Sequence, residues 1–217
     1  LFLFGGAALA FFLCLQDMDW YWTIHGQSFS EIRTPDATVE QLRSTIYTEP
    51  GEIGQDQLTA FASFLFNNNA QIALFAFALG FAFGIPTAWL LAWNGINIGS
   101  MYAVFWAKGL GYEFTGWLMI HGVTELFAII LAGAGGFVIG GAVAFPGRKS
   151  RLTSARDSGQ KAATIAMGCV IMLIIAAVLE GFGRQLINSD TVRYTVAGAT
   201  LVFWLLYFYL PRRRPGA

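Results

Sequence analysis

The stretch "LFAIILAGAGGFVIGGAVAF", residues 126–145, contains twenty consecutive residues without a charged side chain. About 20 such residues are enough for a helix to cross the hydrocarbon core of a bilayer. Of the 217 residues in the chain, 56% are hydrophobic and only 12% are charged, whereas about 25% are charged in an ordinary soluble domain. The sequence therefore predicts an all-α protein, a polytopic transmembrane helical bundle.

Other apolar stretches on both sides of this one predict about six spans in a single transmembrane domain. The predicted spans cover 1–22, 70–93, 96–110, 117–145, 162–179 and 192–210. The span 96–110 is short for a bilayer core of about 30 Å, but we expect it to cross between its neighbours. Because the first residue is Leu1 and an apolar segment follows at once, we also expect a native N-terminal segment to be missing from this sequence.

The distribution of charge predicts the orientation of the spans. Residues 23–60 contain six acidic and two basic residues, whereas residues 146–161 contain five basic residues and one acidic residue. Short loops rich in lysine and arginine stay on the cytoplasmic side of a membrane. We therefore expect the basic loop 147–161 and both termini to be cytoplasmic and the 23–60 segment to be extracytoplasmic. The net charge of zero gives no indication of a nucleic-acid partner.

The extracytoplasmic segment is predicted to contain short amphipathic helices. In "TPDATVEQLRSTIY", residues 34–47, Thr34 is suited to a helix N-cap, and Leu42 and Ile46 fall on one face. The stretch "DQLTAFASFLF", residues 56–66, repeats apolar residues at helical spacing. These helices either pack on the ends of the spans or form a docking surface for an extracytoplasmic partner.

Small residues recur at a spacing of four, which lets helix backbones approach closely in a membrane. The glycines predicted to make helix contacts are Gly80, Gly84, Gly95, Gly99, Gly136 and Gly140. Such stripes suit contacts within one chain and contacts in a homo-oligomer equally well. The dipeptide Asn94-Gly95 is also typical of a turn, so an inner turn formed by Asn94, Gly95 and Gly99 is predicted between the second and third spans.

Polar residues are predicted to meet in one layer near the extracytoplasmic boundary. His121 and Glu125 lie one helical turn apart and share a face of the helix. The following span runs in the opposite direction, and its apolar part ends at Glu180, so Glu180 should reach a similar depth. The full set predicted for this layer is His121, Glu125, Glu180, Arg184, Asn67 and Asn68.

Two interpretations of this layer remain open. Polar groups in a membrane need partners, so the groups can form a hydrogen-bonded cluster that locks helix ends together. Histidine beside carboxylates can also handle protons or ions. A metal site is not predicted, because only two histidines are present, the spacing is not HExxH and neither cysteine lies at this depth. Since no catalytic motif accompanies the spans, we expect no enzymatic activity and no cofactor.

Several motifs together resemble the stage II sporulation protein M family. They are "FLFNNN", "WNGIN", "HGVTELF" and "FPGRKSRL", which occur in this order within a region from about 64 to 210. The resemblance implies a non-catalytic helical protein of the bacterial inner (cytoplasmic) membrane, a scaffold that recruits peptidoglycan-degrading enzymes. The family positions that carry over are Asn67, Asn68, Asn94, Gly95, Gly99, His121, Glu125 and Glu180.

These features favour a non-enzymatic membrane scaffold or anchor. We expect it to lie in the lipid bilayer and to present the 23–60 segment to peptidoglycan-remodelling and other membrane or envelope proteins. The alternative is a transporter or permease-like subunit in which His121, Glu125 and Glu180 handle protons, ions or a polar substrate.

Overall fold

Helices are the only regular elements among the described residues, and the predicted all-α class is confirmed. The computed structural model describes residues 1–26, 32–47, 55–184 and 186–210, without the side chains of 55–62, 64, 65 and 184. The elements are α1 (Phe2–Gln16), α2 (Asp19–His25), α3 (Val39–Ser44), α4 (Gln55–Ala78), η1 (Leu79–Phe81), α5 (Ile85–Ala107), α6 (Gly111–Ala144), α7 (Arg151–Val178), η2 (Leu179–Arg184) and α8 (Asp190–Tyr209). The predicted basic tail, 211–217, lies outside the described residues.

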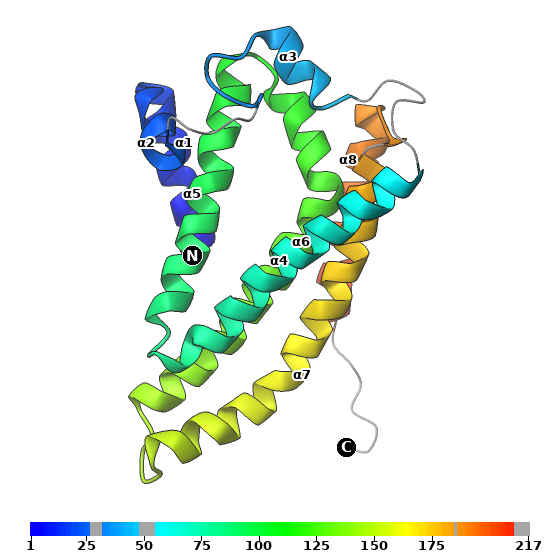
Figure 1. Cartoon of the computed structure of the whole chain (residues 1–217). Helices are drawn as coiled ribbons and strands as arrows, with labels where there is room; N and C mark the ends of the chain where they lie inside the picture. Colours follow the sequence, from blue (N-terminus) through cyan, green and yellow to red (C-terminus); the bar gives the residue numbers. More distant parts are fainter. Residues whose placement is uncertain (27–31, 48–54, 185, 211–217) are drawn as a thin grey trace.

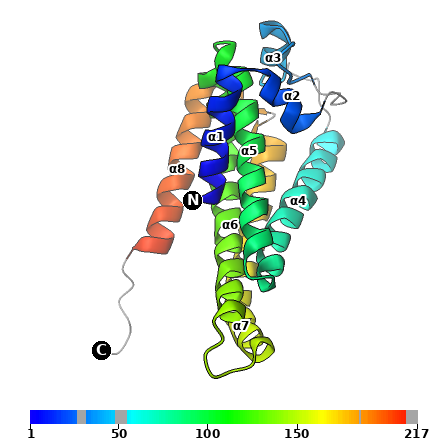
Figure 2. The same cartoon turned by 90° about the vertical axis from the view of Figure 1, so that its left-hand side faces the viewer.

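The long helices alternate in direction along one bundle (Figure 1). We call the end covered by residues 32–47 the cap end, and the end with the connection 145–150 the loop end. Helix α1 runs toward the cap end and α2 folds back beside α5 (Figure 2). Helices α4 and α6 run toward the loop end, α5 and α7 return to the cap end, and α8 descends along α6.

Three of the described helical segments are long and apolar enough to cross a membrane. They are Gly111–Ala144, Arg151–Gly183 and Asp190–Tyr209, and Phe2–Gln16 is apolar but shorter. Large hydrophobic side chains on these segments are exposed, such as Ile171 at 59% on α7. Many exposed large hydrophobic side chains on one helix are unfavourable in water and suit contact with lipid.

The predicted boundaries of the second and third spans, 70–93 and 96–110, are wrong. Helix α4 ends at Ala78, and the chain turns through η1 before α5 begins. Gly84 has a φ of 76° and Phe83 a φ of 62°, which reverses the chain without any polar residue. Pro86 occupies the first turn of α5, a position that tolerates its missing N–H. The chain therefore reverses in the middle of the apolar run 70–93.

The predicted inner turn at Asn94, Gly95 and Gly99 is also wrong, because all three lie inside α5. The Nδ2 atom of Asn94 donates a hydrogen bond to the carbonyl oxygen of Leu90 at 2.9 Å. Because the asparagine amide is satisfied by its own helix, it does not interrupt that helix.

The first predicted span, 1–22, is divided between two helices. Asp17 is extended, with a φ of −149°, and ends α1. Its Oδ1 accepts a hydrogen bond from the N–H of Asp19, the first residue of α2, at 3.0 Å. The start of the fifth predicted span, 162–179, also differs from the structure. Helix α7 begins at Arg151, within the predicted loop 147–161, and the Ser150 hydroxyl caps it by accepting a hydrogen bond from the Thr153 N–H.

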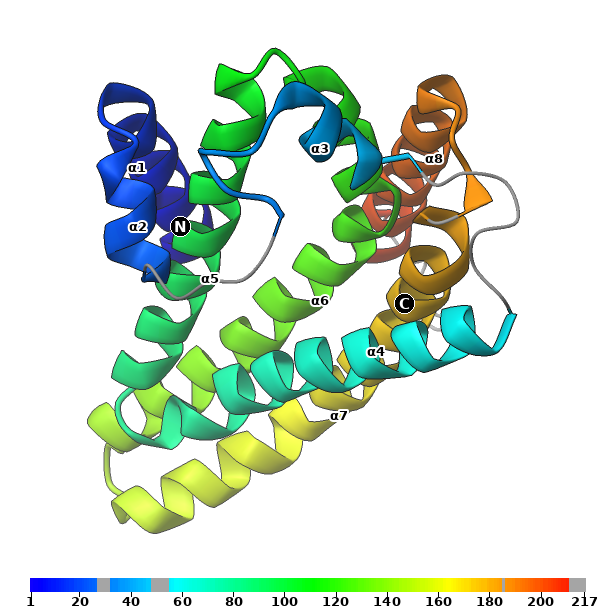
Figure 3. The same cartoon turned by 45° about the horizontal axis from the view of Figure 1, so that its top comes forward.

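The segment 32–47 forms a cap with one short helix, α3, lying across the end of the bundle (Figure 3). The N-cap residue of helix α3 is Thr38, which forms a capping box with Gln41, and not Thr34 as predicted. Leu42 is fully buried and Ile46 is 1% exposed, so the apolar face of the cap packs on the bundle. The other predicted amphipathic stretch, 56–66, forms no separate helix, because it lies inside α4.

Glycines allow the closest helix contacts in the bundle. A Cβ atom added to Gly95 or Gly99 would overlap the carbonyl oxygen of Leu3 or Ala7 on α1. Similarly, Gly80 meets the backbone of Gly136, and Gly140 meets the backbone of Gly80 and Gly84 (these residues join η1 and the turn after it to α6). These glycines are therefore engaged in close contacts within the chain.

Candidate functional site: a buried histidine and two glutamates

The side chains of His121, Glu125 and Glu180 meet between α6 and η2. The Nε2 atom of His121 lies 3.9 Å from Oε2 of Glu125 and 3.4 Å from Oε1 of Glu180. His121 and Glu125 share a face of α6 because they are four residues apart. Glu180 reaches them because α7 is followed directly by η2, which has π-helical geometry. Turns of this kind occur frequently at functional sites.

This cluster is buried from solvent. The exposed side-chain fractions are 4% for His121, 15% for Glu125 and 6% for Glu180. All three residues belong to helical segments that are apolar enough to span a membrane. Ionisable groups in such segments are costly unless they pair with one another or bind an ion. The contacts among these three side chains therefore explain how such apolar helices can contain them.

The helix α8 covers α6 beside the cluster. The Nε1 atom of Trp204 donates a hydrogen bond to Oγ1 of Thr124 at 3.0 Å, and both side chains are buried. Thr124 is adjacent to Glu125 in sequence. This contact of Trp204 was not predicted from the sequence. An indole N–H within an apolar helix needs a hydrogen-bond partner, and that need is the sequence signal for the contact.

We expect Trp204→Phe to lower the free energy of unfolding by about 1 kcal/mol, because one buried interhelical hydrogen bond is lost. Chemical unfolding in detergent micelles measures the effect. Thr124→Val removes the same bond from the other side, so the double variant should lose little more than either single variant. Fully additive losses would contradict this hydrogen bond.

Two other residues predicted for the layer, Asn67 and Asn68, do not join the buried cluster. Asn67 and Asn68 are exposed on α4, whereas His121 and Glu180 are buried. The side chain of Arg184 lies outside the described part of the structure. Of the five predicted side chains that the structure describes, three therefore meet in the cluster: His121, Glu125 and Glu180.

A buried arginine that the sequence analysis did not single out joins the cap to α8. Arg193 is 0% exposed. It donates hydrogen bonds to the carbonyl oxygens of Ile46 and Ile187, both at 2.7 Å, and lies 3.4 Å from Oδ1 of Asp190. Its guanidinium also lies 5.0 Å from the centre of the Tyr47 ring. A single arginine that follows Asp190 at the start of a helix without further charged residues is the sequence signal for such a site.

Tyr47 and Arg33 attach the cap at further points. The Tyr47 hydroxyl donates to Oδ2 of Asp190 at 2.8 Å. Burial, and then the bond to Asp190, raise the pKa of Tyr47, so the phenol remains a hydrogen-bond donor. The Arg33 guanidinium lies 4.4 Å from the centre of the Trp117 ring on α6. The backbone carbonyl oxygen of Arg33 accepts a hydrogen bond from the Tyr21 hydroxyl on α2. The cap is thus fixed to α2, α6 and α8.

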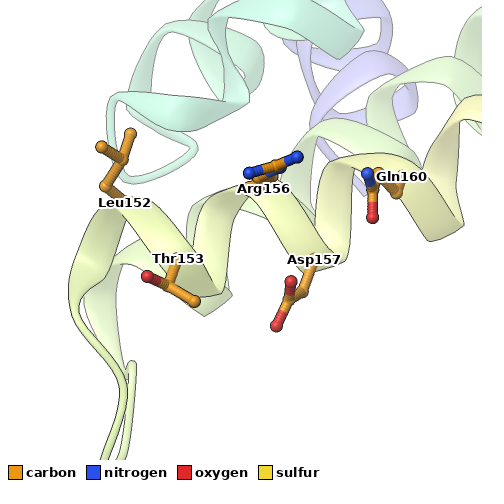
Figure 4. Close-up of a pocket in the computed structure, with 5 residues that line it drawn as sticks. All are labelled: Leu152, Thr153, Arg156, Asp157 and Gln160. Atoms are coloured by element: carbon orange, nitrogen blue, oxygen red, sulfur yellow. The ribbon is translucent and has the colours of Figure 1, made fainter.

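A hollow of about 380 Å³ lies at the opposite end of α7 (Figure 4). Its lining residues are Leu152, Thr153, Arg156, Asp157 and Gln160. All of them come from the first turns of one helix, so the hollow is a surface groove. It lies near the loop end, away from His121 and Glu180.

The chain was compared with known families, curated proteins and solved structures. No curated protein and no solved structure matches the chain. A family model described as "Stage II sporulation protein M" matches residues 1–183. The match begins earlier than the predicted region of resemblance, 64–210. It includes the whole cluster and stops before α8. With the long apolar helices, this match indicates a membrane protein. The chain belongs to the stage II sporulation protein M family.

Proposed function

We propose that this protein is a non-enzymatic scaffold that crosses the bacterial inner membrane six times. In this arrangement α1, α4, α5, α6, α7 and α8 are the spans. The loop end and both termini are cytoplasmic, and the cap end is extracytoplasmic. The alternating direction of these helices supports the proposal, and so does the excess of basic residues in 146–161 over the mainly acidic 23–60 segment.

Cysteine labelling in intact cells tests this orientation. We expect Ser44→Cys, in α3, to react with a membrane-impermeant thiol reagent, because Ser44 is exposed at the cap end. Gln160→Cys, on the exposed side of α7 near the loop end, should react only after the cells are permeabilised. The native cysteines Cys14 and Cys169 are buried and should give a low background. The reverse labelling pattern would contradict the orientation.

One observation carries the scaffold proposal: the cap is rigidly attached but still has an exposed apolar surface. Hydrogen bonds from Tyr21, Tyr47 and Arg193 hold it in place. Ile32 is nevertheless 59% exposed and Val39 is 36% exposed. A preorganised surface loses little conformational entropy when it binds a partner. Together with family membership, this surface supports the recruitment of envelope proteins that remodel peptidoglycan.

The double variant Ile32→Arg/Val39→Arg tests the cap as the binding surface. It adds charge to exposed positions and leaves the buried Leu42 and Ile46 in place. We expect peptidoglycan-hydrolase activity to co-purify with the unmodified protein from crosslinked membranes and to be lost with the double variant. The matched control is Leu152→Arg, a position that is 81% exposed near the loop end. Equal hydrolase recovery with all three proteins would refute the cap as the platform.

The burial of His121, Glu125 and Glu180 in potential spans favours a second candidate function, the movement of protons, ions or a polar substrate. In that case vesicles containing the purified protein should show a flux that disappears with Glu125→Gln. Asp157→Asn, which removes a partly exposed carboxylate near the loop end, is the control. Full flux with Glu125→Gln would exclude this cluster from transport.

A further inference from the structure

The cluster contains three ligand atoms of types that divalent metal ions bind: one imidazole nitrogen and two carboxylate oxygens. One atom from each of His121, Glu125 and Glu180 can be chosen so that all three lie within 4.8 Å of one another. They come from two elements, α6 and η2, that are far apart in sequence. Metal sites assembled from distant segments show no local motif, which is why the spacing around His121 alone gave no indication of one.

The two distances from His121 Nε2 to the carboxylate oxygens are close to those between ligands of a bound ion, and all three ligand atoms lie within 4.8 Å of one another. Zinc binds histidine nitrogen and carboxylate oxygen at about 2.0–2.2 Å, so two ligands in a tetrahedral site lie roughly 3.3–3.6 Å apart. Here His121 Nε2 lies 3.4 Å from the nearer Glu180 oxygen and 3.9 Å from the nearer Glu125 oxygen. Small side-chain rotations would bring all three atoms into one coordination sphere.

The charges of these groups also suit a divalent cation. The two carboxylates are largely buried among apolar helices, and the imidazole supplies at most one positive charge. A divalent ion would balance both carboxylates, and neutral imidazole would be its nitrogen ligand. One imidazole with two carboxylates suits zinc, which accepts both ligand types. Three protein ligands leave one coordination position for a water molecule.

We propose that His121 Nε2 and one carboxylate oxygen each from Glu125 and Glu180 bind a single divalent metal ion, best matched by Zn²⁺, that joins α6 to η2. The ion would hold η2, which continues α7 at the cap end of the bundle, against α6. This site goes beyond the proposed scaffold function, since partner binding at the cap requires no metal.

Zinc binding by the purified full chain tests the proposal. The protein is purified in detergent, its affinity tag is removed and bound metal is stripped with a chelator. Zinc is then added in competition with a chromophoric chelator. We expect one Zn²⁺ per chain. We expect the affinity to fall by about 100-fold or more in His121→Ala, Glu125→Gln and Glu180→Gln, since losing even a residue that only hydrogen-bonds to a metal ligand costs about 10–100-fold. His25→Ala and Asp157→Asn, which change the other histidine and a carboxylate on α7 outside the cluster, should bind zinc normally.

Two further measurements keep the result decisive if a variant folds poorly. Gel filtration identifies misfolded variants, and Glu125→Gln has nearly the shape of the native side chain. X-ray absorption of the zinc-loaded protein should show nitrogen and oxygen ligands at about 2.0–2.2 Å. Mn²⁺ or Fe²⁺ bound with the same dependence on the three variants would support the site with a different ion. Absence of stoichiometric binding, binding unaffected by the variants, or sulfur ligands would overturn it.

Discussion

Gly95→Ala is expected to lower the free energy of unfolding by about 2–3 kcal/mol or to prevent folding. A Cβ atom at this position would overlap the carbonyl oxygen of Leu3 and approach the backbone nitrogen of Ala7. Backbone atoms cannot rotate away as a flexible side chain can, so α1 and α5 would have to separate. Separation would also remove the nearby contact of Gly99 with α1. Thermal unfolding in detergent, together with the yield of monodisperse protein, measures the effect.

Gly168→Ala is the matched control for this prediction. Gly168 lies in α7 and has no atom within 4 Å of the Cβ position. The same substitution should therefore leave the stability unchanged or raise it by about 0.5–1 kcal/mol, because alanine favours the helix more than glycine does. If Gly95→Ala and Gly168→Ala had equal effects, close approach of backbones would not explain the role of Gly95.

Arg193→Met should destabilise the protein by about 3–5 kcal/mol, the usual cost of removing one partner from a buried ion pair. The substitution leaves the carbonyl oxygens of Ile46 and Ile187 without this donor. It also removes the cation beside Asp190, whose side chain is only 23% exposed. Because Ile46 belongs to the cap, limited proteolysis should cleave the 32–47 segment faster in this variant.

The control for Arg193 is Arg43→Met, in the same cap. Arg43 lies 3.7 Å from Glu113, and its side chain is 54% exposed. An exposed pair of this kind contributes about 0–1 kcal/mol, so this variant should unfold almost as the unmodified protein does. If Arg193→Met had an equally small effect, the contacts of Arg193 would not hold the cap in place.

The fold class could be predicted because it depends on composition over long windows. A run of twenty uncharged residues such as 126–145 has few stable alternatives to a membrane-spanning helix. Helix ends within apolar sequence are harder to locate. The reversal at Phe83 and Gly84 depends on positive φ angles, and no change in hydrophobicity accompanies it. Conversely, the Asn94-Gly95 dipeptide has the composition of a turn but lies inside α5, where the Asn94 side-chain amide donates to the carbonyl oxygen of Leu90.

The candidate site was partly predictable for a similar reason. The spacing of His121 and Glu125 places them on one helix face, and counting residues along the next apolar segment brings Glu180 to a similar depth. The contacts of Arg193 and Trp204 were not predicted, because their partners, the Ile46 carbonyl oxygen and the Thr124 hydroxyl, are 147 and 80 residues away. Contacts over such separations depend on how the helices are arranged, which a single sequence does not specify.

The attachment of the cap to α8 has a consequence for biogenesis. Tyr47 and Asp190 are separated by 143 residues, and Arg193 is 147 residues from Ile46. A chain emerging from the ribosome from its N-terminus makes residues 32–47 early but cannot close these bonds until α8 has been translated and inserted. The surface that we propose to bind envelope partners therefore matures last, and an incompletely synthesised chain cannot present it in finished form.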